Sequence, residues 1–89
     1  MQASSMKIEL NPIAYADQKR RKVFVMSEDR SKLIPPSLLR LEDKFGNVHM
    51  VPTNTSGDMT VLDVKQLAAG GYFLRILGEA TKAIRIILF

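Results

Sequence analysis

The chain has 89 residues, which is enough for one domain and too few for a second hydrophobic core. Apolar residues make up 46% of it and charged residues 25%, values typical of folded proteins, so disorder is not expected for most of the chain. The absence of cysteine excludes a disulfide framework, thiolate chemistry and a cysteine-bound zinc ion.

Two β-favouring runs stand in the first third of the chain. Residues 7–10 alternate polar and apolar side chains and end at Asn11-Pro12, a turn signal that stops a strand. Residues 23–26, Val-Phe-Val-Met, form a dense apolar run that predicts a strand buried on both faces.

A long connection and a hairpin follow. Residues 27–36 are predicted to be irregular because Pro35-Pro36 excludes both a helix and a central strand. Residues 38–42 return to alternation, with Leu39 and Leu41 on one face of a strand. Residues 43–47 predict a tight connection in which Gly46 supplies a positive φ. Residues 48–51 are the partner strand, and residues 52–58 are a second loop.

The last third is strongly β-favouring. Residues 59–64 alternate, residues 65–69 form a brief turn, and Gly70-Gly71 closes it. Residues 72–77 and 82–89 are then expected to fold back on each other as a final hairpin. Alternation places Tyr72, Leu74 and Ile76 on one face of the first strand, and Ile84, Ile86 and Leu88 on one face of the second. About seven short strands without an amphipathic helix predict an all-β fold, an immunoglobulin-like antiparallel sandwich. We expect residues 1–5 to be a flexible tail and residues 6–89 to be the domain.

Catalytic chemistry finds little support in the sequence. His49 is the sole histidine, and on a strand it is expected to be exposed or half-exposed, with no orienting partner evident. Asp43 or Asp63 are carboxylates that a metal site would need, but their spacing does not suggest ligation. We therefore expect no enzymatic activity, no cofactor, no metal and no small-molecule substrate.

A basic run, Lys19-Arg20-Arg21-Lys22, holds much of the net charge of +4. A solvated turn leading into a strand is the favoured interpretation. A patch for nucleic acid or an anionic surface is the alternative, and it lacks the exposed aromatic residues or recognition helix that usually accompany such charge.

Four segments, in order, resemble one protein family. Residues 62–76 contain Asp63, Leu67, Gly70 and Tyr72 in a pattern similar to the corner and Gly-x-Tyr-Phe strand of type IX secretion C-terminal sorting domains of Bacteroidetes. Residues 81–86 look like the basic final strand of that family, residues 41–48 like its Asp-x-x-Gly-x-Val hairpin, and Asn11-Pro12 sits where the family opens with Pro-Asn-Pro. The resemblance spans about residues 8–88. Lys65 departs from it by replacing the usual serine.

The resemblance implies a function in export. Such a domain rides at the carboxyl end of a larger exported precursor and is recognised by an outer-membrane secretion machine or a sortase-like enzyme, so the expected location is the cell surface or the exterior. The expected signal residues are those shared with the family's motifs: Asp43, Gly46, Asp63, Leu67, Gly70, Tyr72, Lys82 and Arg85. The edge of the last hairpin, with Lys82 and Arg85, is the rim that the machine would contact.

A free-standing interaction or accessory domain is the second hypothesis. The immunoglobulin-like domain of flagellar-hook capping proteins also has a Gly-x-Tyr strand and a basic final strand, so an adhesin or an assembly component fits the same residues. Edge strands of a sandwich can pair between copies, which makes a homodimer one of the expected associations. Binding of nucleic acid is not expected.

Overall fold

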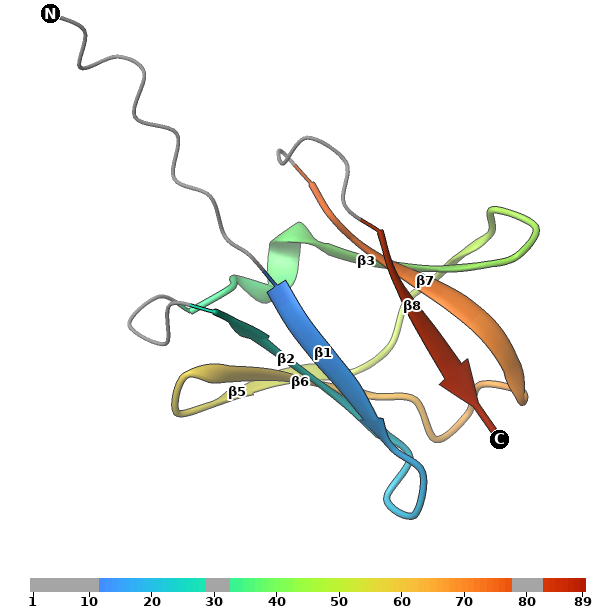
Figure 1. Cartoon of the computed structure of the whole chain (residues 1–89), viewed down its shortest axis with the longest axis horizontal. Coiled ribbons are helices and arrows are strands. Elements are labelled where there is room, and N and C mark those ends of the chain that lie inside the picture. The colour runs from blue at the N-terminus through green and yellow to red at the C-terminus, as the bar shows by residue number, and fades with distance from the viewer. Residues whose placement is uncertain (1–11, 29–32, 78–82) are drawn as a thin grey trace, which may run out of the picture.

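Two four-stranded antiparallel sheets pack against each other in the computed structural model of the chain, which describes residues 12–28, 33–77 and 83–89 (Figure 1). The elements in chain order are β1 (Pro12–Asp17), β2 (Lys22–Ser27), the short 3-10 helix η2 (Pro36–Leu38), β3 (Leu39–Asp43), β4 (Val48–His49), β5 (Thr53–Ser56), β6 (Met59–Asp63), β7 (Gly70–Ile76) and β8 (Ala83–Leu88). The expected strand at residues 7–10, the expected tail at 1–5 and Lys82 lie outside the described residues.

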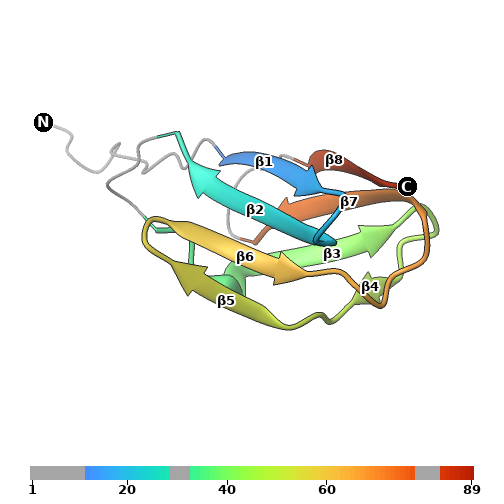
Figure 2. The same cartoon turned by 90° about the horizontal axis from the view of Figure 1, so that it is seen from below.

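The strand order identifies the sandwich type. One sheet, here sheet A, has the order β1-β2-β6-β5, and the other, sheet B, has the order β4-β3-β7-β8 (Figure 2). These are the orders A-B-E-D and C′-C-F-G of an immunoglobulin-like sandwich. The predicted fold class is confirmed, with eight strands in the described part of the chain instead of about seven.

The core lies between the two sheets and is almost wholly aliphatic. Its buried apolar residues are Val23, Val25, Ile34, Leu39, Leu41, Leu62, Val64, Tyr72, Leu74, Ile76, Ile86 and Leu88. Their positions alternate along β2, β3, β7 and β8, because successive side chains of a strand point to opposite faces. The predicted inward faces of β3, β7 and β8 are therefore confirmed.

A tyrosine corner ties the two sheets together at the β6–β7 connection. Tyr72 is buried, and its hydroxyl donates a hydrogen bond of 2.7 Å to the backbone carbonyl of Ala68 four residues upstream. Such a bond at the start of this strand is typical of immunoglobulin-like sandwiches. The Leu67 N–H donates to the Val64 carbonyl in the same corner, which confirms the brief turn predicted over residues 65–69.

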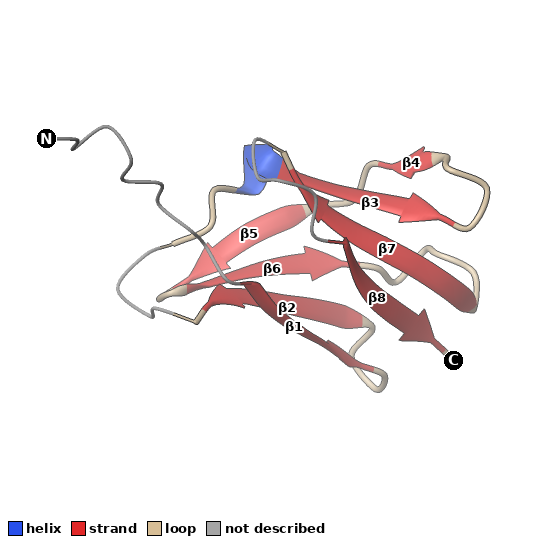
Figure 3. Cartoon of the chain, turned by 45° about the horizontal axis from the view of Figure 1, so that its top comes forward, coloured by secondary structure: helices blue, strands red, loops and turns tan. Residues whose placement is uncertain are grey.

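Three predictions of where strands lie are wrong. Residues 12–17 form β1, although Pro12 was expected to end a strand. Proline is tolerated as the first residue of an edge strand, where its missing N–H is not needed. Residues 53–56, expected to be a loop, form β5 because β6 supplies a partner for the polar segment. Of residues 48–51, only Val48–His49 pairs with β3, and the chain then crosses to sheet A (Figure 3).

Candidate interaction surfaces

Asp43 organises the turn between β3 and β4. One carboxylate oxygen, Oδ1, accepts hydrogen bonds from the backbone N–H groups of Phe45 (2.9 Å) and Asn47 (3.0 Å). The other, Oδ2, lies 2.9 Å from Nε2 of His49. Gly46 completes the turn with φ of 85° and donates its N–H to the Asp43 carbonyl, as predicted from its position in the hairpin.

The electrostatics of Asp43 follow from these contacts. The pKa of Asp43 is lowered to about 2, mainly by the hydrogen bond with His49 and in addition by the backbone donors of Asn47 and Phe45, while partial desolvation opposes the shift. His49 is half-buried as expected. It also has an orienting partner, which the sequence did not suggest, and its ring meets Tyr72 edge-on at 5.7 Å. The pair stabilises the hairpin, because both oxygens of the Asp43 carboxylate accept hydrogen bonds within it. Within the described residues, no three His, Cys, Asp or Glu side chains are grouped to hold a metal ion.

Most of the site residues predicted from the sequence gather at this end of the sandwich. Asp43, Leu67, Gly70 and Tyr72 line one shallow pocket between the hairpin and the β6–β7 corner. Asp63 stands at the far side of Leu67, where its Oδ1 accepts the N–H of Lys65. Gly70 has φ of 148° at the start of β7. The shared motifs are thus residues that shape two turns of the fold.

Arg85 lies apart from this group, on β8. Its side chain is exposed and faces away from the core, opposite Phe73 of β7. The predicted rim around it is only partly open, because β1 and β8 contact each other along one side of the sandwich (Figure 1). The side-chain amide of Gln18 donates to the Ile87 carbonyl (2.8 Å) and accepts from the Phe89 N–H (3.0 Å). This amide takes the place of a neighbouring strand at the end of β8.

The basic run forms the turn between β1 and β2, in line with the favoured interpretation. Asp17 accepts the N–H groups of Lys19 and Arg20. Arg21 has φ of 56°, the one positive value among non-glycine residues of the described chain. Its guanidinium donates to the carbonyl oxygens of Leu67 (2.6 Å) and Phe89 (2.8 Å). Arg21 therefore joins the first turn, the β6–β7 corner and the end of β8, a role that the sequence did not indicate.

The outer face of sheet A carries a continuous apolar surface. Strand register places Ile13 beside Met26 and Met59 in one row, and Tyr15 beside Phe24 and Val61 in the next. We call these residues (Ile13, Tyr15, Phe24, Met26, Met59 and Val61) the apolar face. None of them belongs to the core between the sheets or packs against it. Residues 23–26 are thus buried on one face only, and the prediction that both faces are buried was wrong.

Two of the six residues of the apolar face are exposed, and the other four, Phe24, Met26, Met59 and Val61, are half-buried. Ile13 is 47% exposed and Tyr15 is 53% exposed, and the Tyr15 ring stacks on Phe24 at 5.2 Å. A charged row, Asp17 beside Lys22 beside Asp63, borders it at one end. An antiparallel sheet usually presents polar side chains on its solvent side, so a contiguous apolar surface across three strands is a candidate docking surface.

The outer face of sheet B has a different character. Arg40 pairs with Arg75 across β3 and β7, and Arg85 faces Phe73. The Arg75 guanidinium forms an ion pair of 3.0 Å with Glu42. This face is mixed and basic, which is ordinary for a solvated sheet.

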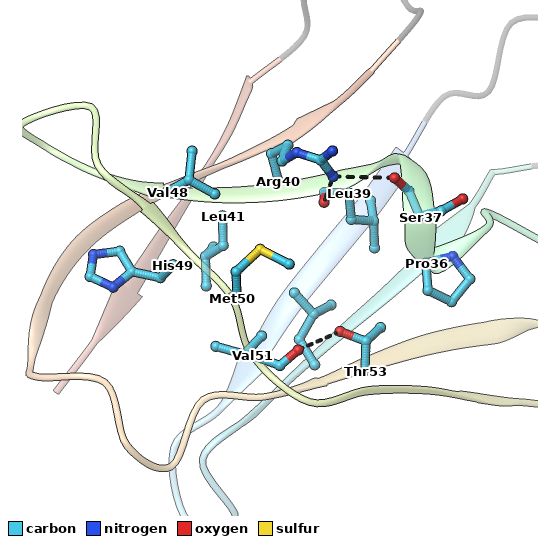
Figure 4. Close-up of a pocket in the computed structure, with 11 residues that line it drawn as sticks. Pro36, Ser37, Leu39, Arg40, Leu41, Val48, His49, Met50, Val51 and Thr53 are labelled. Atoms are coloured by element: carbon cyan, nitrogen blue, oxygen red, sulfur yellow. Dashed lines mark hydrogen bonds between the residues drawn. The ribbon is translucent and has the colours of Figure 1, made fainter.

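A pocket opens on the side of the sandwich opposite β1 and β8, between β3, β4 and β5 (Figure 4). Figure 4 shows Met50 over its mouth between Leu41 and Val51, while His49 points away from it. Above the pocket, the guanidinium of Arg40 donates to the carbonyls of Leu39 (2.9 Å) and Ser37 (3.2 Å). Arg40 thereby covers the part of the β3 edge that β4 is too short to reach.

Comparison with known proteins found no matching family model, no similar curated protein and no similar solved structure. The helices of the described residues include no candidate for a membrane-spanning segment.

Proposed function

We propose that this domain is a non-catalytic protein-binding module whose partner docks on the apolar face. The single observation behind the proposal is that the solvent side of β1, β2 and β6 is apolar across two full rows, outside the core. Tyr, Phe and Met are the side chains enriched at the centres of protein interfaces, and all three are present here. Methionine adds a flexible, polarisable surface that adapts to a partner.

Crosslinking in cells of the source organism tests this proposal. A photoreactive amino acid replaces Tyr15 on the apolar face, and in a matched variant it replaces Arg75 on the outer face of sheet B. We expect a discrete crosslinked protein at position 15 and none of that mass at position 75. The additional change Phe24→Thr, which removes the aromatic ring but introduces a β-branched residue that favours strands, should remove the crosslink. Equal crosslinking from both positions would contradict the proposal.

We also propose a narrower function, a C-terminal sorting and anchoring module of an exported protein recognised by type IX secretion machinery. Its support is the order of the four matching segments and the exposed Arg85 on β8. The turn residues of the motifs already have structural roles in the fold. The sorting proposal therefore depends mainly on Arg85 and on the edge of the last hairpin near it.

A reporter fusion tests the sorting function. Residues 6–89 are fused to the end of a periplasmic reporter in a bacterium that has type IX secretion. Export to the surface is expected, and Arg85→Glu should reduce it, whereas Arg20→Glu, an exposed charge in the β1–β2 turn, should not. A reporter that stays in the periplasm would eliminate the sorting function and leave the docking proposal standing.

A further inference from the structure

Each sheet of the sandwich has two edge strands, and three of these edges are protected. β1 and β8 contact each other, and Gln18 satisfies backbone groups at the end of β8. β4 has only two residues, and Arg40 covers the neighbouring carbonyls on β3. Short edge strands, covering segments and long cationic side chains are the usual means of blocking unwanted strand pairing.

β5 is longer than β4, and among the described residues it has neither a covering segment on its outer edge nor a cationic side chain. Its sequence, Thr-Asn-Thr-Ser, has no charge and no proline, and residues 54–56 are exposed. Figure 2 shows β5 at the rim of sheet A, with no described strand outside it. The short helix η2 contacts β5 but lies behind it in this view, on the side of sheet B, and leaves the rim of the strand uncovered.

Hydrogen bonding to β6 determines which backbone groups of β5 point outward. The Asp63 N–H donates to the Pro52 carbonyl at 2.8 Å, so residue 52 faces β6. Inward and outward groups alternate along an antiparallel strand, so Asn54 and Ser56 also bond to β6. The N–H and C=O groups of Thr53 and Thr55 therefore point away from the sheet.

This pattern is complementary to itself. Two β5 strands can lie antiparallel about a two-fold axis that passes between Asn54 of one copy and Asn54 of the other. Thr53 of each copy then stands opposite Thr55 of the other. Residues paired in this way exchange both of their N–H···O bonds. The threonine side chains then meet on one face, a favourable cross-strand pair, and no like charges are brought together. A closed dimer with one shared patch results, instead of an open chain of copies.

We propose that β5 pairs with β5 of a second copy of this chain, which joins the two copies of sheet A into one continuous sheet. The two-fold axis is normal to the sheet, so both apolar faces lie on the same side of the dimer. The functional meaning of this arrangement rests on the proposed function, because it would place two docking surfaces next to each other. The pairing of the two β5 strands does not depend on the proposed function. The contact is small, so we expect a weak dimer that forms in the micromolar to millimolar range.

Charge-swapped variants at the two-fold axis test the pairing. Asn54 is exposed and would face Asn54 of the second copy, so Asn54→Lys and Asn54→Asp each place like charges opposite one another. Sedimentation equilibrium should show dimerisation weakened about threefold to fivefold in each variant, and restored in an equimolar mixture of the two. Thr55→Pro, which removes an outward N–H and leaves the ladder to β6 intact, should abolish the dimer, whereas Thr55→Val should retain it.

The outcomes separate this proposal from the docking proposal. A wild-type chain that stays monomeric to millimolar concentration overturns the pairing, as does a mixture no more dimeric than its components. Association lost in Phe24→Thr but unchanged in Asn54→Lys would assign the contact to the apolar face and overturn β5 pairing. Asn54→Lys leaves the apolar face intact, so the crosslink at position 15 should persist in it whether or not the dimer forms.

Discussion

The two long sides of the sandwich deal differently with the problem of unpaired strand edges. On one side, β1 and β8 lie against each other, and Gln18 and Arg21 bind the backbone at the end of β8. We call this the closed side. On the other side, β4 is short, β5 is neutral and uncovered, and a pocket separates the sheets. We call this the open side.

The two sides differ in how the backbone groups of their edge strands are satisfied. The closed side uses long polar side chains to satisfy backbone groups that β-strands would otherwise offer to another chain. The open side leaves such groups available and places exposed residues around them. We therefore expect substitutions on the closed side to affect the free energy of unfolding, and substitutions on the open side to affect mainly association.

Arg21→Ala is expected to have the largest effect. The change removes two hydrogen bonds from a charged donor, one part-buried and one exposed, and should lower the free energy of unfolding by about 2 kcal/mol. Urea denaturation measures the loss. Arg21→Gly is the matched control, because it also removes the side chain but relieves the positive φ, and it should be less destabilised than the alanine variant. An alanine variant as stable as wild type would contradict the expectation that side chains of the closed side contribute to stability.

Gln18→Ala should cost about 1 kcal/mol, because the bonds it removes are neutral and exposed. Amide hydrogen exchange at Phe89 should also accelerate, since that N–H loses its acceptor. Gln18→Glu keeps an acceptor for Phe89 but faces the Ile87 carbonyl with a carboxylate, so it should not rescue stability. Unchanged exchange at Phe89 in both variants would show that β1 covers β8 without help from this amide.

Acid should reveal the hydrogen-bonded pair Asp43–His49 of the β3–β4 hairpin as a smaller effect. The folded-state pKa of Asp43 is lowered to about 2, so its contribution to stability is complete above about pH 4 and is lost as the pH falls toward 2. His49→Gln removes the largest cause of the shift, so its stability should depend less steeply on pH in this window. Asp43→Asn removes this titration and is the control. Parallel curves for wild type and His49→Gln would contradict the assignment.

Met50→Ala, on the open side, should change the free energy of unfolding by less than about 0.5 kcal/mol, because the side chain is 86% exposed at the mouth of the pocket. The same urea titration measures it. A loss comparable to that of Gln18→Ala would mean that Met50 belongs to the core, and the contrast between the sides would disappear.

Strands with one polar face were predictable from the sequence. In β3, β7 and β8, charged residues such as Arg40, Arg75 and Arg85 mark the solvent face, so the alternation identified the core residues correctly. β2 could not be assigned in this way. Its two faces are both apolar, and a fully buried strand has the same sequence pattern as one whose apolar outer face is open to solvent.

The remaining errors come from contacts that are distant in the sequence. β5 is polar and gains its structure from β6, and a pattern that looks only at the segment itself indicates a loop. Likewise, Gln18 and Arg21 look like members of a solvated turn, because the carbonyl oxygens that they bind lie near the far end of the chain. The site residues predicted from the sequence include the residues of the turns but none of the apolar face.

The bonds from Gln18 and Arg21 to residues 87–89 have a consequence for folding. They join positions separated by 68 to 71 residues, and closing so long a loop costs entropy before any contact repays it. Domains dominated by such distant contacts fold slowly. We therefore expect β8 to dock late in folding and to detach first in unfolding. Until β8 has docked, the side of the sandwich formed by β1 and β8 stays open.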